Sequence, residues 1–176
     1  SLIKLAKPLY DGIHASLLTL KKSGTGTETP LAERDFPINY VGMALAVLLI
    51  PVFLLYFNIV HHAGIAVLLA VVMMVFGFLF SAVAAYMAGM VGSSNNPISG
   101  VTIATILFSS LLLLLLLGEN SDVGAPAAIM IGAVVCCAAA IGGDNLQDLK
   151  TGHIVGATPW KQQVMQIVGT ISAALV

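Results

Sequence analysis

Polar side chains gather in the segment from Ser93 to Gly100, Ser-Ser-Asn-Asn-Pro-Ile-Ser-Gly, which interrupts two long apolar stretches. Pro97 removes a backbone donor and Gly100 frees the backbone, while Asn95, Asn96 and Ser99 are among the residues that supply side-chain hydrogen bonds. Inside a membrane such groups are costly unless each finds a partner or water. Transporters use broken helices of this kind as substrate or ion sites. A turn exposed to water explains the same residues, and both interpretations stay open.

A second polar group follows in Gly143-Asp144-Asn145-Leu146-Gln147-Asp148-Leu149-Lys150-Thr151-Gly152-His153. In a helix, spacings of three, four and seven would place four of these side chains on one face: Asp144, Gln147, Asp148 and Thr151. Carboxylates one turn apart repel each other, which favours a shared or exchangeable proton. A solvated loop with ordinary charges is the alternative. A proton carrier within this chain must be Asp144, Asp148 or His153, because no acidic residue lies deep in the apolar stretches.

Other residues that could form a metal or catalytic site give weaker signals. His61 and His62 are neighbours, but no carboxylate or cysteine nearby completes a metal site, so we expect no metal. Cys136 and Cys137 are adjacent in an apolar run and are interpreted as small packing residues. The sequence holds no Walker A, H-E-x-x-H, G-x-S-x-G or dinucleotide glycine motif. We therefore expect neither an enzyme nor a cofactor.

Composition identifies the surroundings of these groups. Of 176 residues, 59% are hydrophobic and 9% are charged, and the mean hydropathy is +1.01. A soluble domain has about a quarter of its residues charged, so lipid must replace water over most of this chain. The net charge of −1 argues against a nucleic-acid partner. The expected partner is the lipid bilayer, and the expected fold class is an all-α, polytopic bundle of transmembrane helices.

Hydropathy divides the chain into a first part, 1–38, and a membrane part, 39–176. The first part is predicted to be an amphipathic helix over 1–22 and a loop over 23–37. Four complete spans are predicted over 39–57, 64–91, 101–117 and 127–141, with polar segments at 92–102 and 143–163. A fifth span begins near Val164 and is cut off. The chain opens without Met and ends in an apolar run, so we expect an internal piece of a longer protein.

The basic residues predict the orientation. Five of the seven precede the first span and the other two follow the fourth, at Lys150 and Lys161. Since Lys and Arg favour the cytoplasm and four crossings separate the two groups, both 1–38 and 143–163 are expected to be cytoplasmic.

Small residues recur at four-residue spacing near the ends of the second and fourth spans. The pairs are Ala85 with Gly89, Ala88 with Gly92, Ala138 with Gly142, and Ala139 with Gly143. Such spacing lets helix backbones approach closely in lipid, so these spans are expected to contact protein.

The two polar segments resemble signatures of the oligopeptide transporter family, including its yellow-stripe-like metal-chelate branch. The first is Gly92 to Gly100 with Val-Thr-Ile after it; the second is Gln-Asp-Leu-Lys-Thr-Gly at 147–152, running on to Ala-Thr-Pro at 157–159. Glu-Arg-Asp at 33–35 is similar to the family's cytoplasmic loop. His153 stands where an aromatic residue is expected. The resemblance covers nearly the whole chain and implies a prokaryotic member with further helices.

The resemblance implies a secondary transporter in the plasma (inner) membrane, coupled to protons, that takes up oligopeptides or peptide-like metal chelates of the siderophore type. It makes one set of residues candidates for the substrate pathway: Asn95, Asn96, Pro97, Ser99 and Gly100. It makes a second set candidates for coupling or gating: Asp144, Gln147, Asp148, Lys150, Thr151 and His153. A channel or pore subunit without proton coupling is the alternative. Alternating access fits the broken polar segments better, because it needs a central site that two halves enclose.

Overall fold

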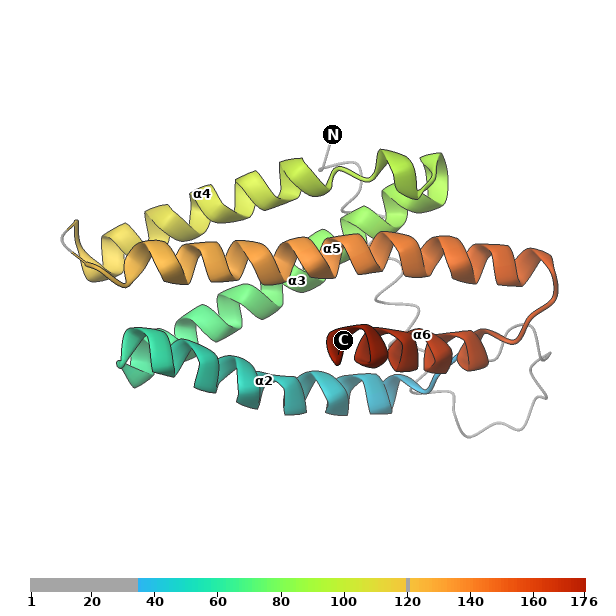
Figure 1. The fold of residues 1–176 in the computed structure, drawn as a ribbon, viewed down its shortest axis with the longest axis horizontal. Coiled ribbons are helices and arrows are strands. Elements are labelled where there is room, and N and C mark those ends of the chain that lie inside the picture. Colours follow the sequence, from blue (N-terminus) through green and yellow to red (C-terminus); the bar gives the residue numbers. More distant parts are fainter. Residues whose placement is uncertain (1–34, 120) are drawn as a thin grey trace. The chain divides into compact units, whose positions relative to one another are not determined.

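The computed structural model describes residues 35–119 and 121–176, and within them the chain is helical without a strand (Figure 1). The elements follow in the order α2 (Ile38–Val60), α3 (Ala63–Val91), the 3-10 helix η2 (Ser93–Asn95), α4 (Ile98–Leu117), α5 (Gly124–Ile154) and α6 (Pro159–Ala174). The all-α prediction is confirmed. The predicted amphipathic helix over 1–22 and most of the loop over 23–37 lie outside the described residues.

Four segments of the described chain are long and apolar enough to cross a membrane, as the sequence predicted. They are Asn39–Val60, Ala63–Val91, Ser93–Leu117 and Gly124–Ile154. Each exceeds the ~20 residues that cross the hydrocarbon core. Pro51 lies inside α2 without ending it, which is possible because neighbouring groups satisfy the freed carbonyl in a membrane helix.

Two helices end at glycines because these positions need a positive φ. Gly92 follows α3 at φ 89° and donates its N–H to the carbonyl of Ala88, and Gly118 follows α4 at φ 79° and donates to Leu114. A side chain strains this backbone region, so glycine is the residue that closes the last turn.

The helix that contains the fourth predicted span extends beyond it. The hydropathy pattern ended that span at Ile141, whereas α5 continues to Ile154 through the polar segment. Hydropathy marks the edge of the hydrocarbon, while a helix continues until its hydrogen bonding is interrupted. That interruption is Gly156, at φ 77°.

The fifth helix also begins earlier than predicted. α6 starts at Pro159 rather than near Val164, because proline at the first helical position gives up only an N–H that has no partner inside the helix. With 16 residues it is shorter than the four membrane-spanning segments.

The chain divides into two compact units, which are described separately. One comprises 1–44 and 148–176, and the other comprises 45–147. The second unit contains the buried core, to which α2 contributes Tyr56 and to which α3, α4 and α5 contribute rows of small and branched side chains.

Two hydroxyl side chains of α4 face the protein interior while several of its leucines face outward, which is the opposite of a water-soluble helix. Thr105 and Ser109 are fully buried, while Leu111 and Leu115 are 61% and 85% exposed. The Thr105 hydroxyl donates to the carbonyl of Val101 at 2.8 Å, so it is satisfied within its own helix. This distribution suits a helix whose outer face meets lipid.

Small residues bring α3 and α5 together, as the four-residue spacing predicted. A Cβ placed on Gly89 would lie 3.0 Å from Cδ2 of Leu146, and one on Gly142 would collide with the Ser81 hydroxyl and lie 3.1 Å from the Ser81 carbonyl oxygen. Glycine is therefore needed where these two backbones approach.

Replacing Gly142 by alanine should destabilise the membrane domain, by about 1–3 kcal/mol for an overpacked position. The Ser81 backbone cannot move away from the new methyl group without shifting α3. The measurement is the thermal unfolding midpoint Tm of the full-length protein in detergent. Gly77→Ala is the matched control, because nothing lies within 4 Å of a Cβ at Gly77 in α3. Equal Tm values for the two variants would contradict the close packing.

Candidate functional site

The first polar segment is a break between two membrane helices. After Gly92 the backbone makes one turn of 3-10 helix, η2, and Asn96 and Pro97 then lead into α4 (Figure 1). Asn96 donates its N–H to the Ser93 carbonyl at 3.1 Å, and Ile98 donates to the Asn96 carbonyl at 2.8 Å. Asn95 is turned back on α3, where its side-chain nitrogen donates to the Val91 carbonyl at 3.3 Å. Local bonds therefore satisfy part of the interrupted ladder.

Asn96 joins this break to α5. Its side-chain Nδ2 donates to the carbonyl oxygen of Ala139 at 3.1 Å, although that carbonyl belongs to a helix 43 residues away in sequence. The side-chain Oδ1 is buried and has no hydrogen-bond donor in the described part of the chain. Flipping the amide would bring two oxygens together, so the bond to Ala139 fixes which end of the amide is unpaired. An unpaired buried acceptor is a place where water, a proton donor or a ligand can bind.

Two further residues of α5 contact the break, one through a hydrogen bond and one through close packing. Ser93 donates its backbone N–H to Oε1 of Gln147 at 2.8 Å. A Cβ on Gly143 would collide with Nδ2 of Asn96 and lie 3.6 Å from Cβ of Ala88. Ala139, Gly143 and Gln147 follow at four-residue spacing, so one face of α5 holds Ser93 and Asn96 of the segment. The structure thus brings together Asn96 and Gln147, which the sequence assigned to two separate groups.

The other residues of the predicted pathway set are exposed within the described chain. Asn95, Pro97, Ser99 and Gly100 are exposed, whereas Asn96 is half-buried. Ser99 and Gly100 lie in the first turn of α4, where no side-chain cap is present and backbone N–H groups point away from the helix. The segment is therefore neither a fully wetted turn nor a fully buried site. The side of the segment that carries Asn96 packs against α5, and the opposite side is exposed.

The second predicted set lies on the last three turns of α5, so its residues are helical, as the spacing assumed. Asp144, Asp148, Lys150, Thr151 and His153 are exposed, and Gln147 contacts the break. Asp144 and Asp148 are one turn apart. Within residues 35–119 and 121–176, no group of three His, Cys, Asp or Glu side chains could hold a metal ion.

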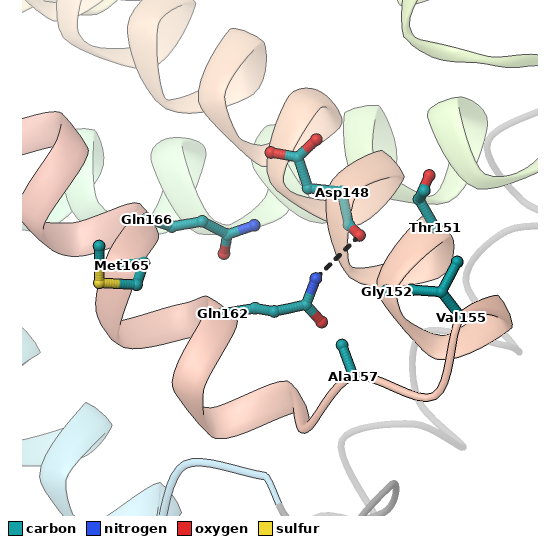
Figure 2. A pocket seen from close by; sticks show the side chains of 8 residues that line it. All are labelled: Asp148, Thr151, Gly152, Val155, Ala157, Gln162, Met165 and Gln166. Carbon is teal, nitrogen blue, oxygen red and sulfur yellow. Dashed lines mark hydrogen bonds between the residues drawn. The ribbon is translucent and has the colours of Figure 1, made fainter.

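The connection from α5 to α6 is a tight turn. The N–H of Ala157 donates to the carbonyl of Gly152 at 2.8 Å around Gly156, which is the hydrogen bond that closes a helix end by a left-handed glycine. Gln162 of α6 then reaches back, and its Nε2 donates to the carbonyl of Asp148 at 3.3 Å (Figure 2). A Cβ on Gly152 would collide with the Gln162 carboxamide, so this glycine is what allows α6 to lie against α5.

Gln163 links α6 to the residues that precede α2. Its Oε1 accepts the backbone N–H of Phe36 at 2.9 Å, and its Nε2 lies 3.5 Å from Oδ1 of Asp35. The two segments lie on either side of α2, α3, α4 and α5 in sequence, and this contact brings them together.

Sequence reasoning missed the glutamines of α6. Gln162 contacts Asp148, Gln163 contacts Phe36, and Gln166 lines the pocket beside them, but the first two were counted as the edge of a polar loop and the third as part of the fifth span. A signal was present: carboxamides at spacings of three and four in a helix that is otherwise mostly apolar indicate a face that meets polar groups rather than lipid.

Comparison with known proteins gives a consistent result. Residues 3–176 match the family model described as OPT oligopeptide transporter protein. The chain is also 36% identical over 192 aligned positions to a protein of Haemophilus influenzae named "Putative oligopeptide transporter", and the alignment covers 100% of this chain and 30% of that protein. The chain therefore spans about a third of the length of the curated relative it matches. No solved structure matches it.

Asn96→Ala and Gly143→Ala should not have additive effects on stability. The first removes the hydrogen bond to Ala139, and the second forces a methyl group against the Asn96 amide. The double variant lacks that amide. Its loss of unfolding free energy should therefore be smaller than the sum of the two single losses by about 0.5–3 kcal/mol, the usual coupling of contacting residues. Tm of the full-length protein for the four members of the cycle measures this. Additive losses would show that the two residues do not touch.

Gln163→Ala should loosen the start of α2. Loss of the acceptor for the Phe36 N–H removes a bond worth about 0.5–1.5 kcal/mol, so amide exchange at Phe36 should accelerate by up to about tenfold. Hydrogen exchange of the full-length protein in detergent, read by mass spectrometry for peptides covering 35–40, measures it. Gln163→Glu keeps an acceptor and should protect this amide better than alanine does. Unchanged exchange in Gln163→Ala would contradict the contact.

Proposed function

Since the chain belongs to the oligopeptide transporter family, we propose that the full protein is a secondary active transporter that takes up oligopeptides or peptide-like metal chelates. Protons drive the uptake in this proposal. The membrane-spanning helices described above form one part of this transporter, and the remaining helices of the full protein complete it.

The break between α3 and α4, held against α5, is the observation that carries the proposal. Discontinuous helices supply transporters with polar backbone and side-chain groups at positions that ordinary membrane helices cannot offer. Here Asn96 keeps an unpaired buried oxygen beside α5, and Ser99 and Gly100 begin α4 on the open side. In the proposal, substrate passes along this open side: Asn95, Asn96, Pro97, Ser99 and Gly100 form its wall.

The end of α5 supplies the groups proposed for coupling. Asp144 follows Gly143, the residue that packs on Asn96, so a change in its protonation is close to the break. Asp148 and His153 are further exchangeable groups on the same helix end, while Lys150 and Thr151 lie between them. Gln147 connects this helix end to the break through Ser93. A helix is rigid, so a change at these groups can be transmitted to the broken segment.

The proposal places the protein in the plasma (inner) membrane with 1–38 and 143–163 in the cytoplasm. The distribution of Lys and Arg supports this orientation, and so does the contact of Gln163 with Asp35 and Phe36. In this orientation the coupling groups meet the cytoplasm, where the proton is released.

Proteoliposomes that hold the full-length protein should acidify inside when a transported substrate is added outside. A pH-sensitive dye in the lumen measures this after addition of mixed short peptides or of ferric chelates. Acidification with one of them establishes symport and names the substrate class. Substrate uptake without acidification, insensitive to a proton ionophore, would instead identify a channel or uncoupled carrier.

Asp144→Asn tests the coupling assignment in the same vesicles. The neutral side chain should abolish the dependence of uptake on a pH gradient while leaving substrate exchange between the two sides, because exchange needs no net proton movement. Asp122→Asn, in the loop before α5, is the matched control and should behave as the wild type. If Asp144→Asn retains full gradient-driven uptake, the proton is carried elsewhere.

A further inference from the structure

A pocket lies between the end of α5 and α6, and the proposed function assigns no ligand to it. Its volume is about 510 Å³, and within the described chain it is lined by Asp148, Thr151, Gly152, Val155, Ala157, Gln162, Met165 and Gln166 (Figure 2). Binding pockets for small molecules have volumes of about 300–1,000 Å³, so a short peptide segment fits this size. All eight residues belong to one compact unit, so the pocket is formed by that unit itself.

The charge of the lining selects among ligands. The eight lining residues include one carboxylate, Asp148, and no Lys, Arg or His. Figure 2 shows this carboxylate turned away from the Gln162 carboxamide, which contacts the Asp148 carbonyl instead. Asp148 is exposed, and among the residues that the structure describes no hydrogen bond or ion pair engages its carboxylate. Such a lining repels anions and attracts a group with a positive charge and N–H donors.

One carboxamide of the pocket suits a peptide backbone. Gln162 is held by its bond to the Asp148 carbonyl, which fixes the orientation of the amide, and its Oε1 is buried without a donor in the described chain. Gln162 therefore holds α6 against the end of α5, and its buried oxygen is closed to a ligand in the pocket. Gln166 follows one turn later on the same face of α6. A carboxamide carries a donor and an acceptor as a peptide group does, so it pairs with a backbone whatever the side chains are.

We propose that this pocket is a subsite for the amino-terminal end of a short peptide. Asp148 pairs with the terminal ammonium, Gln166 binds the first peptide group, and Gln162 holds the two helices that form the pocket together. The inference rests on the proposed function and deepens it, because a pocket with one carboxylate and no cation accepts peptides and disfavours anionic metal chelates.

Equilibrium binding to the purified full-length protein tests the subsite with three probes: Ala-Ala-Ala, its N-acetylated form and its C-terminal amide. Isothermal titration calorimetry gives each Kd. N-acetylation removes the ammonium and should weaken binding by about tenfold, the usual gain of a charge-assisted over a neutral hydrogen bond. The C-terminal amide should bind as well as the free tripeptide, because the pocket has no cation for the carboxylate.

Three variants assign the effect to this pocket. Asp148→Asn should weaken Ala-Ala-Ala to the affinity of the N-acetyl peptide, whereas Asp148→Glu should keep the preference for a free amino terminus. Gln166→Leu should weaken the free and the acetylated peptide by the same factor, since it removes a backbone contact. Asp122→Asn and Thr170→Val, one turn beyond Gln166 and outside the lining, are the matched controls and should bind as the wild type does.

The outcomes separate this inference from the proposed function. Peptide uptake into proteoliposomes with no effect of N-acetylation, or with the preference intact in Asp148→Asn, overturns the subsite and leaves the transporter standing. Tighter binding of a ferric chelate than of Ala-Ala-Ala, lost in Asp148→Asn, overturns the assignment to peptides. Absence of both binding and uptake for every probe overturns the subsite together with the proposed function.

Discussion

A bilayer offers the backbone no hydrogen-bonding partner, and the rest of this structure follows from that constraint. Four of the helices are long because a continuous helix satisfies every peptide group within one segment. The stretch from Gly92 to Pro97 departs from this rule between two spans. Local bonds and two contacts on α5, from Asn96 to Ala139 and from Ser93 to Gln147, satisfy part of its polar groups and leave Oδ1 of Asn96 unpaired within the described chain. The broken helix therefore depends on the unbroken one.

That dependence explains the small residues of α5. Gly142 and Gly143 leave room for Ser81 and Asn96, and a methyl group at either position would collide with a polar side chain. In lipid, helices associate through close packing and interhelical hydrogen bonds rather than through exclusion of water. At these positions glycine therefore stabilises the helix pair more than a residue with a side chain would. The exposed leucines of α4 contribute nothing to this packing and are the surface that faces lipid or other helices.

One helix links the two polar groups. α5 has 31 residues and a length of about 46 Å, more than the ~30 Å of hydrocarbon, so part of it extends beyond the membrane core. Its last turns carry the carboxylates, and the turns before them hold the break. α5 thus runs without a break from the residues that hold the interrupted segment to those that carry the carboxylates. The pocket beside Asp148 lies on the same helix end.

The sequence by itself determined the all-α class, the membrane, the four spans and the family. Each depends on composition, on runs of apolar residues or on contiguous signatures, which are properties of the chain in order. The sequence also placed Asn96 and Gln147 among the candidates. It could not show that they belong to one structure, because their contacts join residues 43 and 54 positions apart. The extension of α5 to Ile154 and the pocket formed by the α6 glutamines were likewise decided by the tertiary structure. Hydropathy reports the solvent around a segment, whereas a helix end and a contact depend on which backbone groups and side chains meet in space.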